Sequence, residues 1–120
     1  MKENTIRDKS FAFALRVVKL AKFLESKKKE FVLSKQVLRS GTAIGALVRE
    51  AEHAESKADF IHKMSIALKE ANETSYWLEL LHQGEYIDKE SFESIRFDSE
   101  EIIKLLVAIV KTSKVSKLSE

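Results

Sequence analysis

Two Glu-x-x-His motifs are the residues of this chain with the spacing best suited to metal chemistry. They are Glu50 to His53 and Glu79 to His82, and paired motifs of this type hold di-iron centres inside four-helix bundles. Here both motifs fall near the C-terminal ends of consecutive expected helices. Because these helices run antiparallel, the two motifs would lie about 24 Å apart along the bundle, at about 1.5 Å of rise per residue. We therefore expect no metal site, no cofactor and no catalytic centre.

Gly41 and Gly45 stand one helical turn apart. They lack the Lys-Ser/Thr pair that follows the glycines of a phosphate-binding loop. Inside a helix, residues without large side chains allow another helix to approach closely, and we predict this packing role for both. The chain has no cysteine, which excludes disulfides, thiolate metal sites and cysteine nucleophiles. No small-molecule substrate is indicated.

Basic side chains give the clearest indication of a partner. Lys35, Arg39 and Arg49 lie on one outward stripe of an expected helix, and the lysines at 27–29 form a turn at the Lys35 end. Such a strip fits a phosphate backbone, because each neutralised phosphate adds salt-dependent affinity. The stripe has no interleaved aromatic residues and no base-reading motif, so binding of RNA or other nucleic acid would depend little on sequence.

Charge is unevenly distributed along the chain. Residues 1–49 contain 12 lysines and arginines against four acidic residues, a net charge of +8, whereas residues 50–120 contain nine against 15, a net charge of −6. This asymmetry suits an anionic partner at one end. Two alternatives remain: a solvated basic face, or ion pairs between that face and Glu70 and Glu73 of a neighbouring subunit.

Apolar periodicity predicts four helices. They span residues 9–25, 34–55, 57–82 and 88–112. Ser34, Ser56 and Asp88 are the expected N-caps of the last three, and Gly84 is expected to end the third helix in a left-handed conformation. With short connections the helices must run antiparallel, so the predicted fold is all-α, an up-down-up-down four-helix bundle.

The length of the chain fits one domain over residues 1–120, with an ordered core at about 6–113 and frayed ends. In the second helix the predicted core stripe is Val37, Gly41, Ile44, Val48 and Ala51. The longest apolar run, residues 105–110, has six residues, far short of the ~20 that span a bilayer. No signal segment is evident, so we expect a cytoplasmic protein without membrane contact.

Two of the expected helices are apolar on two faces. In the first helix, Phe13, Val17, Leu20 and Leu24 form one face. The opposite face of that helix comprises Phe11, Leu15 and Val18. The third helix has a similar second apolar face, formed by Ile66, Trp77 and Leu80. A helix with two apolar faces buries both, and monomers rarely expose large apolar patches. These residues are therefore the predicted interface of a homo-oligomer.

Three segments together resemble a known family: FVLSKQVLRSGTAIGA at 31–46, ADFIHKMSIALKEA at 58–71 and ETSYWL at 73–78. They resemble bacterial four-helix-bundle proteins called 23S rRNA intervening-sequence proteins. GEYI at 84–87 and IVKT at 109–112 also fit, so the resemblance covers about residues 6–113. It implies an up-down four-helix bundle assembled as a ring, typically a homopentamer.

Genes of this family were first noticed within insertions in large-subunit ribosomal RNA genes, which is an association and not an activity. A distantly similar group, the accessory variability proteins of diversity-generating retroelements, forms basic pentameric rings that work with RNA and a reverse transcriptase. By analogy the resemblance implies nucleic-acid contacts at Lys35, Arg39 and Arg49. We expect a non-enzymatic homo-oligomer that binds RNA or other nucleic acid through a basic face. The alternative is a protein–protein interaction scaffold with no nucleic-acid role.

Overall fold

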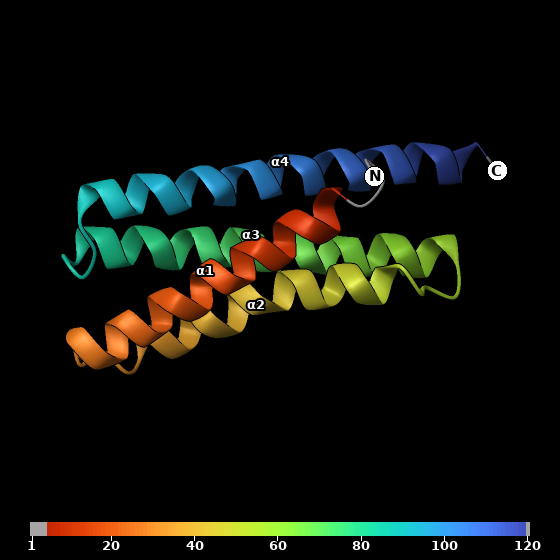
Figure 1. Cartoon of the computed structure of the whole chain (residues 1–120). Coiled ribbons are helices and arrows are strands. Elements are labelled where there is room, and N and C mark those ends of the chain that lie inside the picture. The colour runs from red at the N-terminus through yellow and green to blue at the C-terminus, as the bar shows by residue number, and fades with distance from the viewer. Residues whose placement is uncertain (1–4, 120) are drawn as a thin grey trace.

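Four α-helices make up the computed structural model, which describes residues 5–119. They are α1 (Thr5–Lys27), α2 (Leu33–Ala51), α3 (Lys57–Gln83) and α4 (Lys89–Leu118). Consecutive helices run antiparallel and pack along one another in an elongated bundle of 52 × 24 × 22 Å (Figure 1). No strand occurs between residues 5 and 119. The prediction of an all-α, up-down-up-down four-helix bundle is confirmed.

Local capping signals start α3 and α4 as predicted. The Ser56 hydroxyl accepts a hydrogen bond from the backbone N–H of Asp59 at 3.0 Å. The Asp88 carboxylate accepts one from the backbone N–H of Ser91 at 2.8 Å. Each cap satisfies one of the backbone donors that the first turn of a helix leaves unpaired, which fixes where the helix begins.

The start of α2 corrects the prediction that Ser34 is its N-cap. The N-cap residue is Val32, whose side chain makes no capping hydrogen bond. Instead the Glu30 carboxylate accepts from the backbone N–H groups of Val32 at 3.3 Å and Ser34 at 2.9 Å. Ser34 lies buried in the first turn, where its hydroxyl donates to Glu25 at 3.2 Å. A side chain from outside the helix thus replaces the expected cap.

The end of α3 corrects the prediction of a left-handed glycine. Gly84 has φ −81°, and the left-handed residue is Glu85 with φ 68°. The backbone N–H of Glu85 donates to His82 at 3.0 Å, and that of Tyr86 donates to Leu81 at 2.9 Å. This pair of bonds is the Schellman arrangement, which places the left-handed residue one position later than expected.

The helix ends also differ from the predicted ranges. α1 begins at Thr5, and α2 ends at Ala51 instead of residue 55. Residues 114–118, expected to be frayed, continue α4 to Leu118. There the Ser116 hydroxyl is hydrogen-bonded to Lys57 Nζ at the start of α3, at 2.9 Å. The other positions expected to be frayed, residues 1–4 and 120, lie outside the described residues.

Buried apolar side chains from all four helices form one core cluster. The five predicted core positions of α2 are all buried. The hydroxyls of Ser40 on α2 and Thr74 on α3 are hydrogen-bonded at 2.9 Å within this core. Between residues 5 and 119 no helix combines the length and apolar character needed to cross a bilayer.

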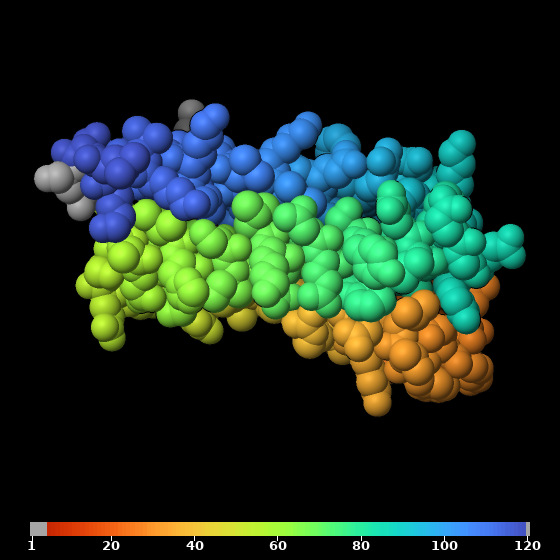
Figure 2. Space-filling model, turned by 180° about the vertical axis from the view of Figure 1, so that it is seen from behind, coloured from red at the N-terminus to blue at the C-terminus, as the bar shows by residue number. Residues whose placement is uncertain are grey.

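The α1 helix crosses the bundle obliquely (Figure 1). Seen from behind, α3 and α4 form a continuous face. The orange segment that includes the α1–α2 connection projects beyond α3, at the end where α3 joins α4 (Figure 2). This end of the bundle is therefore built from two connections, residues 28–32 and 84–88, that are far apart in the sequence.

Candidate nucleic-acid interface

Arg39, the central residue of the predicted basic stripe, forms ion pairs within its own chain. Its guanidinium contacts the carboxylates of Glu70, at 3.2 Å, and Glu73 on α3. The hydrogen bond from Arg39 lowers the pKa of Glu73, and a second one, from the Trp77 indole N–H at 3.0 Å, acts in the same direction. The same bond to Glu73 is the main cause that raises the pKa of Arg39.

These contacts revise two interpretations of the stripe. One alternative paired Glu70 and Glu73 with the basic face of a neighbouring subunit, but both pair with Arg39 of the same chain. Because two carboxylates already neutralise this guanidinium, a phosphate would have to displace them, so Arg39 is a weak candidate contact. Its structural role is to join α2 to α3.

Arg49 and Lys35, the other two residues of the stripe, differ from Arg39. The Arg49 guanidinium carbon lies 5.0 Å from the centroid of the Phe11 ring, a cation–π contact between α2 and α1. Arg49 is exposed. Lys35 is also exposed, and no ion pair connects it to another residue of the described chain. Both can reach an external anion.

The residues predicted to form a subunit interface divide between α1 and α3. On α1, Phe11 and Leu15 are each 50% exposed, and Val18 is half-buried. The α3 residues are less open: Ile66 and Trp77 are half-buried, and Leu80 is 37% exposed. Trp77 also packs against the core of its own bundle. The outer face of α1 is therefore the larger unsatisfied apolar surface.

The two predicted packing glycines lie against α1. A Cβ on Gly41 would fall 2.8 Å from both γ carbons of Val17, which is closer than side chains tolerate. A Cβ on Gly45 would lie 3.4 Å from the Ser10 carbonyl oxygen, an ordinary contact distance. Only Gly41 stands where any side chain would collide with α1.

The histidines of the two Glu-x-x-His motifs have different surroundings. His53 is exposed beyond the end of α2, and His82 stacks on Phe92 with ring centroids 4.3 Å apart. Over the described residues 5–119, no three His, Cys, Asp or Glu side chains are close enough together to hold a metal ion.

The sequence interpretation placed the lysines at 27–29 at the Lys35 end of the stripe but did not include Lys19 and Lys22 of α1. With them a larger basic site lies at the end of the bundle that holds the α1–α2 connection. We call it the lysine-rich end. Six lysines gather there, on the last turns of α1, the connection and the start of α2: Lys19, Lys22, Lys27, Lys28, Lys29 and Lys35. None of them forms an ion pair with another described residue. The nearby acids Glu25 and Glu30 bind Ser34 and Val32 instead.

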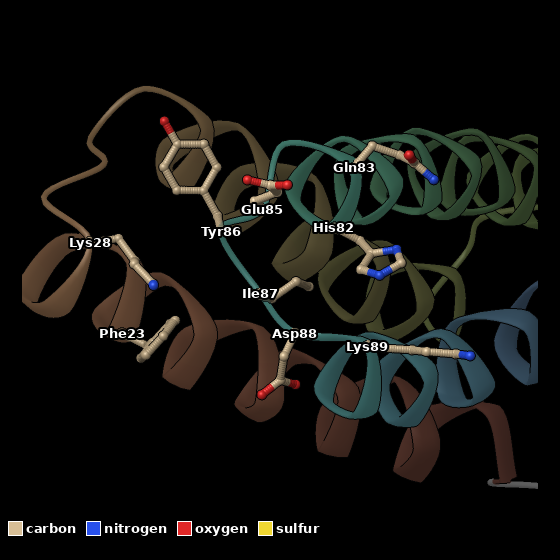
Figure 3. Close-up of a pocket in the computed structure, with 9 residues that line it drawn as sticks. All are labelled: Phe23, Lys28, His82, Gln83, Glu85, Tyr86, Ile87, Asp88 and Lys89. Carbon is tan, nitrogen blue, oxygen red and sulfur yellow. The ribbon is translucent and has the colours of Figure 1, made fainter.

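Aromatic residues accompany these lysines in space, although they do not alternate with them along α2. Phe23 is 39% exposed and Phe31 is 52% exposed, and Tyr86 approaches from the α3–α4 connection. The Lys28 ammonium lies 5.9 Å from the centroid of the Phe23 ring. Figure 3 shows the Lys28 ammonium directed toward Phe23, whereas the Tyr86 ring extends from the α3–α4 connection away from Phe23, at the rim of the hollow that all three residues line. The signal was present in the sequence as Phe23 and GEYI, but only folding brings the two connections together.

Two adjoining hollows occur at the lysine-rich end. The first, of about 510 Å³, is lined by Phe23, Lys28, His82, Gln83, Glu85, Tyr86, Ile87, Asp88 and Lys89 (Figure 3). The second, of about 440 Å³, lies between α1 and α4 and is lined by Arg16, Lys19, Leu20, Phe23, Ile87, Asp88, Ser91 and Ile95. Phe23, Ile87 and Asp88 border both. The first hollow has Lys28 and Lys89 but also Glu85 and Asp88 along its edge, and the second has Arg16 and Lys19 with Asp88.

A family model and a solved structure both relate this chain to one protein family. A family model described as 23S rRNA-intervening sequence protein matches residues 2–108. A crystal structure of a protein of unknown function from the S23 ribosomal protein family of Bacteroides thetaiotaomicron is 64% identical, with a TM-score of 0.87. The match covers 88% of this chain and 98% of that one. A search of curated proteins gave no match.

Proposed function

Because the chain belongs to the 23S rRNA-intervening sequence protein family, we propose that it is a non-catalytic, homo-oligomeric protein of the cytoplasm that binds RNA. The binding surface is basic and contacts mainly phosphates. The family relationship covers the four-helix fold, and the solved relative is itself described as having unknown function. The proposal therefore depends on the charges and exposed side chains of this chain.

The observation that carries the RNA proposal is the set of unpaired lysines at the lysine-rich end. Lysines in ion pairs would have to exchange a carboxylate for a phosphate, whereas these six have no such partner among the described residues. Clustered cations release counterions when they contact a nucleic-acid backbone, which favours binding at low salt. Lys35 continues this surface onto α2, and Arg49 extends it toward the other end of that helix.

Self-association is supported by the outer face of α1. Phe11 and Leu15 each leave half of their surface exposed, beside the half-buried Val18. Adjacent exposed apolar side chains mark interaction surfaces. We propose that a second copy covers this face and that five copies close the ring, the number that the family resemblance implies.

A titration of RNA against matched variants tests the binding proposal. Fluorescence anisotropy with a labelled RNA hairpin should show binding that weakens about 100-fold between about 50 and about 200 mM salt, if four phosphates are neutralised. Replacing residues 27–29 by glutamate should abolish binding at low salt. Replacing Lys104, Lys111 and Lys114 on α4 with glutamate makes the same change in charge at another place, and this variant should keep most of the RNA binding at low salt. No binding of the wild-type protein at low salt would contradict the proposal.

The alternative function, a protein–protein scaffold, is favoured by the same exposed α1 face. Light scattering after size exclusion should give an oligomeric mass for the wild-type protein and a monomeric mass for Leu15→Glu. An oligomer that binds no RNA would support the scaffold alternative. A monomeric wild-type protein would remove the basis for both the ring and the scaffold.

A further inference from the structure

The hollow at the lysine-rich end is bounded by two aromatic rings that come from different parts of the fold. Phe23 extends from α1, and Tyr86 extends from the α3–α4 connection (Figure 3). The position of Tyr86 is set by the hydrogen bond from its backbone N–H to the carbonyl of Leu81, at 2.9 Å. Aromatic faces at a surface pocket offer a stacking platform for planar groups.

The charges around the hollow are arranged asymmetrically. Lys28 lies between the two aromatic residues on the α1 side, next to the unpaired lysines of the connection. Asp88 also lines the hollow and is negatively charged there: the backbone N–H of Ser91, at 2.8 Å, lowers the pKa of its carboxyl, and the charge of Lys28 acts in the same direction. Glu85, on the opposite side from Lys28, would repel a phosphate. An anion therefore fits on the lysine side, and an uncharged planar group fits deeper in the hollow.

We propose that the lysine-rich end binds an unpaired RNA base, which enters the hollow and stacks on the exposed face of Phe23, with Tyr86 at the rim, while Lys28 contacts an adjacent phosphate. This proposal rests on the RNA-binding function proposed above and gives it a specificity for single-stranded segments. A base held in a duplex is stacked on its neighbours and cannot enter, whereas bases in loops and ends can. The volume of about 510 Å³ is within the range of small-molecule pockets.

An anionic membrane surface would also attract exposed lysines and apolar residues such as Phe31 and Val32. The structure favours RNA because the rings border a hollow with polar side chains along its edge, whereas a membrane-binding surface presents a continuous apolar face. Vesicle binding is therefore kept as an outcome of the test.

The test compares single-stranded oligouridine with a duplex RNA of equal length by anisotropy at low salt. The double variant Phe23→Leu/Tyr86→Leu should bind the single strand about tenfold or more weakly, because base stacking is lost, and should bind the duplex as the wild type does. Lys28→Gln should weaken both. Phe97→Leu and Lys104→Gln, at exposed positions on α4, are the matched controls and should change neither.

Photo-crosslinking of wild-type protein to oligouridine containing 5-iodouridine gives a second readout that needs no variant. Crosslinks should map to Phe23 or Tyr86 by mass spectrometry and should be absent with the duplex. If the wild type binds RNA but the double variant is unaffected and crosslinks lie elsewhere, this inference is wrong while the proposed function stands. If the wild type binds no RNA, both are wrong. Binding to phosphatidylglycerol vesicles that Phe31→Ser abolishes, without a single-strand preference, would also overturn it.

Discussion

The α1 helix packs against its two neighbours, α2 and α4, in different ways. On the α2 side the helices approach through residues with little or no side chain. Val17 is fully buried against Gly41, and the Ser10 backbone lies at contact distance from Gly45. Close approach of this kind fixes the position of one helix on another, because tightly packed surfaces tolerate little displacement.

On the α4 side, long polar side chains bridge the gap. Arg16 reaches Asp98 at 2.8 Å and the Ser94 hydroxyl at 2.9 Å, and Lys9 reaches Glu101 at 3.1 Å. Both ion pairs are more than a third exposed, so each contributes little stability and can adjust its geometry. Beyond Arg16, toward the end of α1, the hollow between α1 and α4 opens.

The contrast between these two sides of α1 indicates where a binding site can form in so small a bundle. Shape on the α2 side holds α1 in place, and the charged contacts on the α4 side leave room between the helices. The candidate RNA site occupies the loosely packed side and the adjoining connections. Three substitutions measure how unequal the two sides are.

The largest effect is expected from Gly41→Val on the tightly packed side. A Cβ alone would lie 2.8 Å from both γ carbons of Val17, and valine adds two further carbons in a stiff arrangement. Overpacking of this kind should lower the free energy of unfolding by about 3 kcal/mol or more. Chemical denaturation followed by circular dichroism measures it, with Ala46→Val at an exposed position of α2 as the control. An unchanged midpoint would show that α1 can move away from α2.

A smaller effect of opposite sign is expected from Gly45→Ala on the same side. Here the new Cβ would meet the Ser10 carbonyl oxygen at 3.4 Å, which requires at most a slight shift. Alanine favours the helix over glycine by about 0.5–1 kcal/mol, so the variant should be more stable by up to that amount. Denaturation under the same conditions tests this. A loss of stability as large as that of Gly41→Val would mean that the whole contact between α1 and α2, and not only the contact at Gly41, leaves no room for a side chain.

The smallest effect is expected from Arg16→Met on the loosely packed side. Loss of an exposed ion pair should lower the free energy of unfolding by about 0.5 kcal/mol or less. The difference from wild type should shrink further at high salt, because screening already weakens the pair. Arg96→Met, which removes ion pairs within α4 alone, is the control. A decrease of several kcal/mol in the free energy of unfolding would refute the view that exposed ion pairs on the α4 side contribute little stability.

Periodicity and local capping were sufficient to predict the fold. The four helices follow from apolar spacing, and Ser56 and Asp88 cap them as expected because each cap involves only neighbouring residues. The predictions failed where a group outside the expected helix decides. Glu30 replaces Ser34 as the cap of α2, and α4 continues past residue 112 beside Lys57 of α3.

The candidate site was less predictable. The basic character of the first half of the chain was evident, but the stripe on α2 ranked Arg39 with Lys35, and only the packing of α3 against α2 shows that Arg39 is neutralised. Phe23 belongs to α1 and Tyr86 to the α3–α4 connection, so no spacing rule could place them around one hollow. Helix periodicity reports which face is buried, and it carries no information on how connections meet.

Two residues with side chains adopt a left-handed backbone conformation in the described chain, Lys29 and Glu85, and both lie in the connections at the lysine-rich end. Glycine reaches that conformation without the about 1–2 kcal/mol that other residues incur. A glycine at either position would relax the backbone and delete a charge at once. At Lys29 such a glycine would favour stability but remove a charge that attracts phosphate, whereas at Glu85 it would remove a charge that repels phosphate.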